Sequence, residues 1–92
     1  MNTMFVKTPN EQAMVIADNL KMLRKGRKLS LRALSEVSGI SYASLRRFEE
    51  TGEISLKSLI KVAIVLDATE PLDKLFAVSE VKSIQELINR SM

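Results

Sequence analysis

The side chains of this sequence that could do chemistry are its charged ones, because the 92 residues include neither histidine nor cysteine. Without them the chain has no imidazole base, no Ser-His-Asp triad, no thiolate nucleophile and no common zinc site. Its acidic residues are spaced like helix surface positions. The glycines stand singly, thirteen residues apart, at Gly26, Gly39 and Gly52, so no phosphate-binding loop is present. We therefore expect no catalytic residue, no metal ligand, no cofactor and no enzymatic activity.

The chemistry that remains is the binding of a polyanion. Between Lys21 and Phe48 the sequence has eight basic residues and one acid, Glu36, whereas the rest of the chain has six basic and ten acidic residues. One basic stretch on an otherwise acidic chain indicates a directed site for a polyanion such as double-stranded DNA. Charge alone leaves a merely solvated basic surface equally open.

Capping residues and apolar spacing predict the elements that position this stretch. The first helix begins at a capping box of Thr8 and Glu11, with Pro9 in its first turn, and ends at Gly26. Its apolar residues recur at three- and four-residue spacing and form one stripe, namely Ala13, Ile16, Ala17, Leu20 and Leu23.

Serines mark the expected starts of the next three helices. Ser30 precedes a short helix that Gly39 ends, and Ser41 precedes a third helix that ends at Thr51 and Gly52. Ser55 precedes a fourth helix, whose expected buried stripe is Leu56, Leu59, Ile60, Ala63 and Leu66.

The fourth helix leaves alternatives open. Its many β-branched residues also suit a strand, although its length of about twelve residues favours a helix. Val62, Ile64 and Val65 extend its apolar arc beyond one face, either as scattered exposed residues or as a dimer patch. Pro71 is expected to start a short fifth helix that runs through Leu72, Leu75 and Phe76.

The second and third helices, joined at Gly39, form the pattern of a helix-turn-helix. Glycine accepts the left-handed backbone that such a tight turn needs. Ser35 is small where the two helices cross, and the residues expected to lock them together are Leu34, Ile40, Leu45 and Phe48. The opposite side of the third helix stays available for DNA through Tyr42, Ala43, Arg46 and Arg47.

On these residues, positions 20–76 resemble the Xre/Cro family, which has a five-helix lambda-repressor-like fold. The stretches that carry the resemblance are Leu20 to Arg24, Leu29 to Ser35, Gly39 to Ser41, Leu45 to Glu49, and Leu72 to Phe76. Leu31 and Ala43 depart from the family, which often has polar residues at these positions. The resemblance implies an all-α, five-helix helix-turn-helix domain, here followed by a short C-terminal helical extension.

The resemblance also implies which residues meet DNA. Arg47 is the expected base reader, because a guanidinium can bond guanine through two parallel hydrogen bonds. Tyr42 and Ala43 are expected to contact a thymine methyl, and the residues expected at phosphate are Ser41, Ser44 and Arg46. Arg32 is also expected to bind DNA, and three more basic residues complete the expected surface, by phosphate contact or only through a general field: Lys25, Arg27 and Lys28. Tyr42, Arg46 and Arg47 could instead be ordinary exposed side chains.

Arg24 and Glu49 occupy positions that face each other in proteins of this family. We therefore expect a buried or half-buried ion pair between them. Removing one partner of a buried pair costs about 3–5 kcal/mol, because the other charge is left without compensation.

The chain divides into three expected parts. Residues 1–7 are flexible or extended, residues 8–76 form the DNA-binding domain, and residues 77–92 form an interaction or dimerisation extension. In the extension a second capping box at residues 83–86 predicts a helix to about Arg90. Its apolar face of Ile84, Leu87 and Ile88 is expected to bind the second subunit, the protein's own core or a toxin.

These features predict a cytoplasmic transcriptional repressor that binds an inverted-repeat operator as a homodimer. No run of 18 apolar residues and no signal peptide occur in the sequence, so no membrane partner is expected. The layout also resembles antitoxins of the HipB type, which pair with HipA-type kinases and repress their own operon. The alternatives are an antitoxin whose main role is to bind a toxin, and a phage-type Xre regulator with no toxin.

Overall fold

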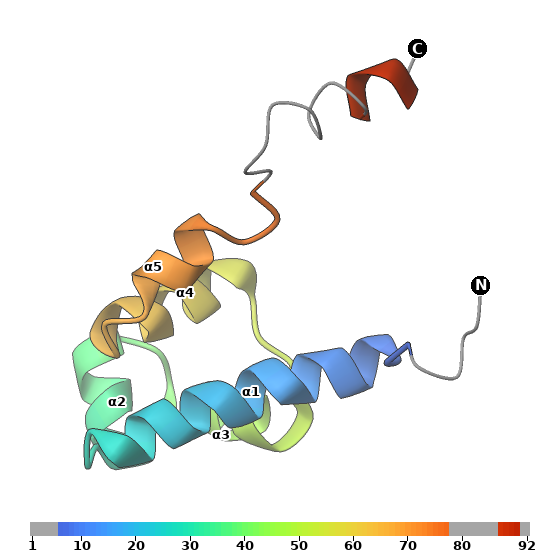
Figure 1. Cartoon of the computed structure of the whole chain (residues 1–92). Coiled ribbons are helices and arrows are strands. Elements are labelled where there is room, and N and C mark those ends of the chain that lie inside the picture. The colour runs from blue at the N-terminus through green and yellow to red at the C-terminus, as the bar shows by residue number, and fades with distance from the viewer. Residues whose placement is uncertain (1–5, 78–86, 91–92) are drawn as a thin grey trace.

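Five helices follow one another along the chain, and the structure, a computed structural model, describes residues 6–77 and 87–90 (Figure 1). The helices are α1 (Pro9–Gly26), α2 (Leu31–Ser38), α3 (Tyr42–Thr51), α4 (Leu56–Val65) and α5 (Thr69–Asp73). Residues 87–90 form a further helical turn, and the described residues include no strand. The predicted all-α fold is therefore confirmed, and the fourth element is a helix.

The first four helices begin where their capping residues predict. Each capping hydroxyl accepts a hydrogen bond from the backbone N–H three residues further on, at 3.0–3.1 Å, in Thr8, Ser30, Ser41 and Ser55. At Thr8 the Glu11 side chain accepts in return from the Thr8 N–H at 3.1 Å, which completes the capping box. The contacts of the Glu11 carboxyl with Thr8 lower its pKa, chiefly through the Thr8 N–H and then through the Thr8 hydroxyl.

The helix ends are less uniform than the sequence suggests. Gly39 and Gly52 end α2 and α3 in the left-handed region, with φ of 75° and 81°. Gly26, by contrast, is the last residue of α1, and the left-handed residue beyond it is Lys28, with φ of 58°. The turn after α1 therefore places a non-glycine residue where glycine is usual.

The core forms where α3 packs against α1 and α2, and where α2 packs against α4. In Figure 1, α1 runs along the base of the domain, with α4 and α5 on the opposite side. The buried apolar residues are Ala17, Leu34, Ile40, Leu45, Phe48, Val62, Ala63 and Leu66. Four helices thus contribute to one core, with Ile40 added from the turn between α2 and α3.

The buried face of α4 differs from the predicted stripe. Leu56 and Ile60 are 67% and 38% exposed, whereas Val62, assigned to an outer arc, is 1% exposed and lies in the core with Ala63 and Leu66. This helix is apolar around most of its circumference, so periodicity alone fits more than one stripe. The packing of α2 against α4 decides which of them is buried.

The fifth helix also differs from its prediction. It begins at Thr69, two residues before Pro71, and ends at Asp73, so Leu75 and Phe76 lie in the turn that follows. Proline needs only a place in the first turn, where the backbone N–H has no intrahelical acceptor, and the third position meets this need as well as the first. Phe76 is 91% exposed.

An apolar groove remains open between α1, α4 and α5. Ile16 and Leu23, part of the predicted stripe of α1, are 40% and 42% exposed because they border this groove of about 410 Å³. Its other apolar lining residues are Leu20, Leu59, Ala63, Ala68, Pro71, Leu72 and Leu75. One side of the α1 stripe therefore packs on α3, and the other faces an unfilled surface.

The C-terminal extension is described only in part. Residues 87–90 are helical, with Leu87 and Ile88 about half exposed. The predicted capping box at 83–86 and the apolar position Ile84 lie outside the described residues. Among the helices that the structure describes, none is long and apolar enough to cross a membrane.

Candidate nucleic-acid interface

The turn between α2 and α3 is fixed by hydrogen bonds as well as by Gly39. The Ser35 hydroxyl donates to the Ile40 carbonyl at 2.5 Å, and the Ile40 N–H donates to the Ser38 hydroxyl at 3.2 Å. Ile40 itself is buried. Ser35 thus does more than leave room for the crossing of the helices, because its hydroxyl ties α2 to the start of the next helix.

The two sides of α3 lie in different environments. Leu45 and Phe48 are 1% and 2% exposed and anchor the inner side in the core. All six positions predicted to meet DNA on this helix and its cap are exposed: Ser41, Tyr42, Ala43, Ser44, Arg46 and Arg47. These exposed positions lie on both sides of the buried Leu45 in the sequence, so the exposed side runs along the first part of α3.

Both exposed arginines of α3 have acidic partners. Arg46 Nε donates to Glu50 Oε1 at 3.0 Å, one helical turn away, and this bond raises the pKa of Arg46. Arg47 donates through Nε to Glu53 Oε2 at 2.9 Å and through Nη2 to the same oxygen. Glu53 lies just beyond α3, after Gly52. The positive charge of this surface is therefore partly balanced.

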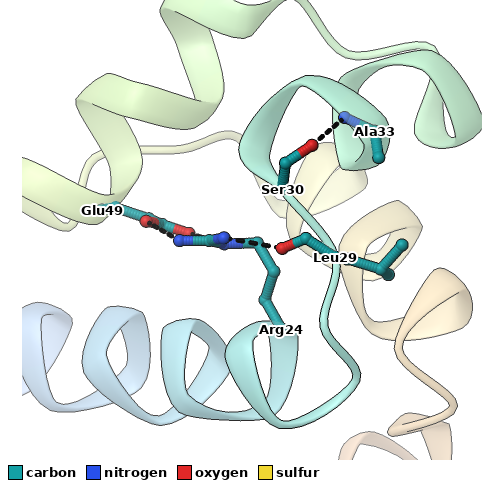
Figure 2. A network of polar contacts seen from close by, with 5 residues as sticks. All are labelled: Arg24, Leu29, Ser30, Ala33 and Glu49. Atoms are coloured by element: carbon teal, nitrogen blue, oxygen red, sulfur yellow. Dashed lines mark hydrogen bonds and ion pairs between the residues drawn. The ribbon is translucent and has the colours of Figure 1, made fainter.

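The ion pair predicted between Arg24 and Glu49 forms on the inner side of α3 (Figure 2). Arg24 Nε donates to Glu49 Oε2 at 2.7 Å and Nη2 donates to Oε1 at 3.0 Å, so the pair is bidentate. Nη1 donates to the Leu29 carbonyl at 2.8 Å. The side chains of Arg24 and Glu49 are 10% and 11% exposed. One guanidinium thus joins α1 to α3 and to the connecting segment that leads into α2.

A second contact fixes α3 against α1. The backbone of Gly52 lies so close to α1 that a Cβ atom at this position would stand 2.8 Å from the Cβ of Ala13. Glycine is therefore required at Gly52 by its left-handed backbone and by the approach of the neighbouring helix. The last turn of α3 is therefore held against α1 by the Arg24–Glu49 pair, and its C-cap by the close approach of Gly52.

A family model described as Helix-turn-helix matches residues 20–73 of the chain, which is more than half of its length. The chain belongs to the helix-turn-helix family. As a member of that family it is a DNA-binding regulator, which agrees with the exposed outer side of α3. Neither a curated protein sequence nor a solved structure matches it.

In this helix-turn-helix protein the start of α2 joins the outer surface of α3. The guanidinium of Arg32 lies over the ring of Tyr42, 4.9 Å from its centroid, in the geometry of a cation–π contact. Tyr42 is 37% exposed, so part of its side chain remains open to solvent beside Arg32. The structure therefore brings these two predicted DNA-contacting residues together.

The remaining basic residues lie at the far end of α1. Lys25, Arg27 and Lys28 are all exposed around the connection between α1 and α2. In the part of the chain that the structure describes, none of the three has an ion-pair partner. These three side chains are therefore available to a polyanion. Arg24, another basic residue of the same stretch, is not available because it belongs to the buried pair with Glu49.

Sequence reasoning missed the carboxylates of Glu50 and Glu53. The four-residue spacing of Arg46 and Glu50 on one helix is a signal that could have found the first pair. Glu53 lies beyond a helix-ending glycine, so no periodic rule places it beside Arg47. Among the described residues no cluster of three acidic side chains could hold a metal ion.

Proposed function

We propose that this helix-turn-helix protein is a sequence-specific transcriptional repressor that inserts α3 into the major groove of its operator. The observation that carries the proposal is the division of α3 into a fixed side and an open side. Arg24 and Glu49 hold the inner side against α1, and the outer side exposes Tyr42 and Arg47. A recognition helix reads base edges reliably only when the scaffold behind it is rigid.

The proposed roles follow from side-chain chemistry. Arg47 bonds the O6 and N7 atoms of one guanine, and Tyr42 and Ala43 contact the methyl group of a thymine. Contacts to phosphate come from the hydroxyl and basic groups around them, namely Ser41, Ser44, Arg46, Arg32, Lys25, Arg27 and Lys28. Phosphate contacts set register and affinity, whereas the base contacts set sequence preference.

Two substitutions separate these roles. Arg47→Ala should relax the preference at one base position and cost about 1–3 kcal/mol of specific binding. Lys28→Ala should weaken binding to all sequences alike and lower the slope of log K against log salt by about one unit. The measurement is fluorescence anisotropy with duplexes selected from a random library by the wild-type protein. An equal loss on selected and random duplexes for Arg47→Ala would rule out its role as a base reader.

The repressor is proposed to act as a two-fold dimer on an inverted repeat. One recognition helix reads too few base pairs to define a single site in a genome, and two-fold symmetry doubles that number. The groove between α1, α4 and α5, with Leu75 52% exposed at its border, supports a second copy as the partner that covers it. The half-site centres should lie about 34–36 Å apart.

Footprinting and sedimentation test this arrangement. Protection of two symmetric half-sites by two chains is the expected result. Protection of one unrepeated half-site by one chain would contradict the dimer and leave the DNA-binding role of α3 in place.

The second candidate function is that of a HipB-type antitoxin bound to a HipA-type kinase, with a phage-type Xre regulator lacking a toxin as the alternative. The chain continues past α5 into a helical turn at 87–90, and Phe76 is 91% exposed where the extension begins. The amphipathic pattern of Ile84, Leu87 and Ile88 makes this extension the proposed partner-binding element.

Truncation after Ala77 tests the second candidate. A shortened protein that still folds, dimerises and binds DNA, and that no longer co-purifies with a kinase encoded beside it, would support the antitoxin function. Loss of dimerisation would instead make the extension a self-association element. A shortened chain that behaves like the full one in every assay would show that the extension is no interaction helix.

A further inference from the structure

The Arg47 side chain is held by a short network that begins and ends on its own residue. Its Nε donates to Glu53 Oε2 at 2.9 Å, and its Nη2 donates to the same oxygen. The Thr51 hydroxyl donates to the Arg47 carbonyl at 2.7 Å and accepts from the Glu53 N–H at 3.1 Å. Thr51 therefore fixes the backbone of Glu53 relative to Arg47, and the carboxylate is delivered to one edge of the guanidinium.

The donors that Glu53 leaves unused include a pair that can bond guanine. A guanidinium has five N–H donors in a planar fork. Glu53 takes the Nε donor and one donor of Nη2, which together form the side edge. Within the described residues, Nη1 and the second hydrogen of Nη2 make no hydrogen bond. One hydrogen of Nη1 and the second hydrogen of Nη2 form the end edge, whose two parallel donors match the O6 and N7 atoms of guanine.

We propose that Glu53 is a positioning residue for sequence recognition, which holds Arg47 by its side edge so that the end edge is presented to a guanine. This proposal rests on the proposed function of Arg47 as the base reader. Arg47 is otherwise a long side chain whose ordering on binding would oppose association. Glu53 orders it in advance.

The charge of Glu53 acts in the opposite direction on DNA in general. A carboxylate beside the recognition helix repels phosphates, so it weakens binding to every sequence. The same residue therefore strengthens binding to the right base and weakens binding to all others. Its net effect is on the ratio between specific and random binding, which is the quantity that decides occupancy of one site in a genome.

Glu50, which lies on the same helix as Arg47, provides a matched control for Glu53. Its pair with Arg46 has side-chain exposures of 60% and 63%, and those of Glu53 and Arg47 are 63% and 68%. Glu50→Ala and Glu53→Ala thus remove one equally exposed carboxylate each from beside a recognition-helix arginine. Only the second removes the partner of the proposed base reader.

The experiment measures binding of the full chain to a duplex selected by the wild-type protein and to a random duplex of equal length, at several salt concentrations. Glu53→Ala should tighten binding to the random duplex, weaken binding to the selected one, and lower their ratio about three- to tenfold. Glu53→Gln keeps a carbonyl acceptor for Arg47 and should preserve most of the ratio. Glu50→Ala should tighten both and leave the ratio unchanged.

A double variant makes the test independent of general charge effects. With Arg47→Ala already in place, Glu53 has no side chain to position, so adding Glu53→Ala should leave the ratio as it is. The proposal is overturned if Glu53→Ala shifts both duplexes by the factor seen for Glu50→Ala, or if it lowers the ratio equally without Arg47. If Arg47→Ala itself leaves the ratio intact, the proposed reader is wrong, and that outcome is distinguishable because it does not involve Glu53.

Discussion

Removal of the Glu49 carboxylate should be among the most destabilising single changes in this domain. Arg24 and Glu49 are about nine-tenths buried and share two hydrogen bonds of 2.7 and 3.0 Å. Glu49→Ala leaves a buried guanidinium with its bond to the Leu29 carbonyl and with two donors unpaired. Breaking such a pair costs about 3–5 kcal/mol. Two unsatisfied buried donors at about 1–3 kcal/mol each give a similar range.

That loss is large relative to the total free energy of unfolding of the domain. At about 0.05–0.15 kcal/mol per residue, a domain of this size is stable by roughly 4–10 kcal/mol. Glu49→Ala should therefore unfold a substantial fraction of the protein at 37 °C, or lower its urea midpoint by a third or more. Helicity followed by circular dichroism during urea denaturation gives the free energy of unfolding. Glu50→Ala, which breaks an exposed pair, should change that free energy by less than about 1 kcal/mol.

A double variant distinguishes a lost pair from lost packing. Arg24→Met with Glu49→Leu removes both charges and refills the space with apolar atoms, so only the Leu29 carbonyl is left without its partner. This double change should cost about 1–3 kcal/mol, less than either single removal of a charge. The reasoning is refuted if Glu49→Ala costs no more than the exposed control, or if the double variant loses the sum of the two single losses.

Other predictions concern the glycines, the core and the first helix. Alanine at Gly39 or Gly52 must adopt a left-handed backbone, which costs about 1–2 kcal/mol. Only at Gly52 would the new Cβ also lie 2.8 Å from the Cβ of Ala13, so Gly52→Ala should lower the free energy of unfolding by at least about 1 kcal/mol more than Gly39→Ala. Equal denaturation midpoints for the two would contradict the close approach. Leu34→Ala, at a position 2% exposed, should cost about 2–5 kcal/mol in the same assay. An NMR titration should find the pKa of Glu11 below its ordinary value of 4.5, because the carboxylate accepts from its capping threonine. A carboxyl group whose pKa is lowered by folding stabilises the folded state at pH values above its ordinary pKa. This stabilisation is lost as the pH falls through the lowered pKa, so amide protection in the first turn of α1 should fall in that pH range. An unshifted titration would mean that the capping box does not persist in solution.

The starts of the first four helices were predictable from the sequence because their causes are local. A serine or threonine needs only the backbone N–H three residues away, so Thr8, Ser30, Ser41 and Ser55 identify the caps without knowledge of the fold. The Arg24–Glu49 pair spans 25 residues and could not be found this way. Its prediction came from the family resemblance.

What the sequence could not decide depends on how the helices pack and on the direction in which the chain leaves a turn. The α4 residues offer several apolar stripes, and only the position of α2 selects the one that contains Val62. Glu53 follows a left-handed turn at Gly52, so its position beside Arg47 depends on the direction in which the chain leaves the helix. The exposure of Ile16 and Leu23 reflects a gap between helices, and no periodic pattern reveals a gap.

The separation of α3 into two sides has an evolutionary consequence. Stability depends on Leu45, Phe48 and Glu49, and the proposed readout depends on Tyr42 and Arg47, so no residue belongs to both sets. Substitutions that alter the target sequence therefore leave the free energy of unfolding nearly unchanged, since exposed helix positions usually contribute less than about 0.5 kcal/mol. After gene duplication, such a protein can acquire a new DNA target sequence without first acquiring compensating stabilising mutations. The same separation makes the outer side of α3 a suitable place to graft foreign recognition residues.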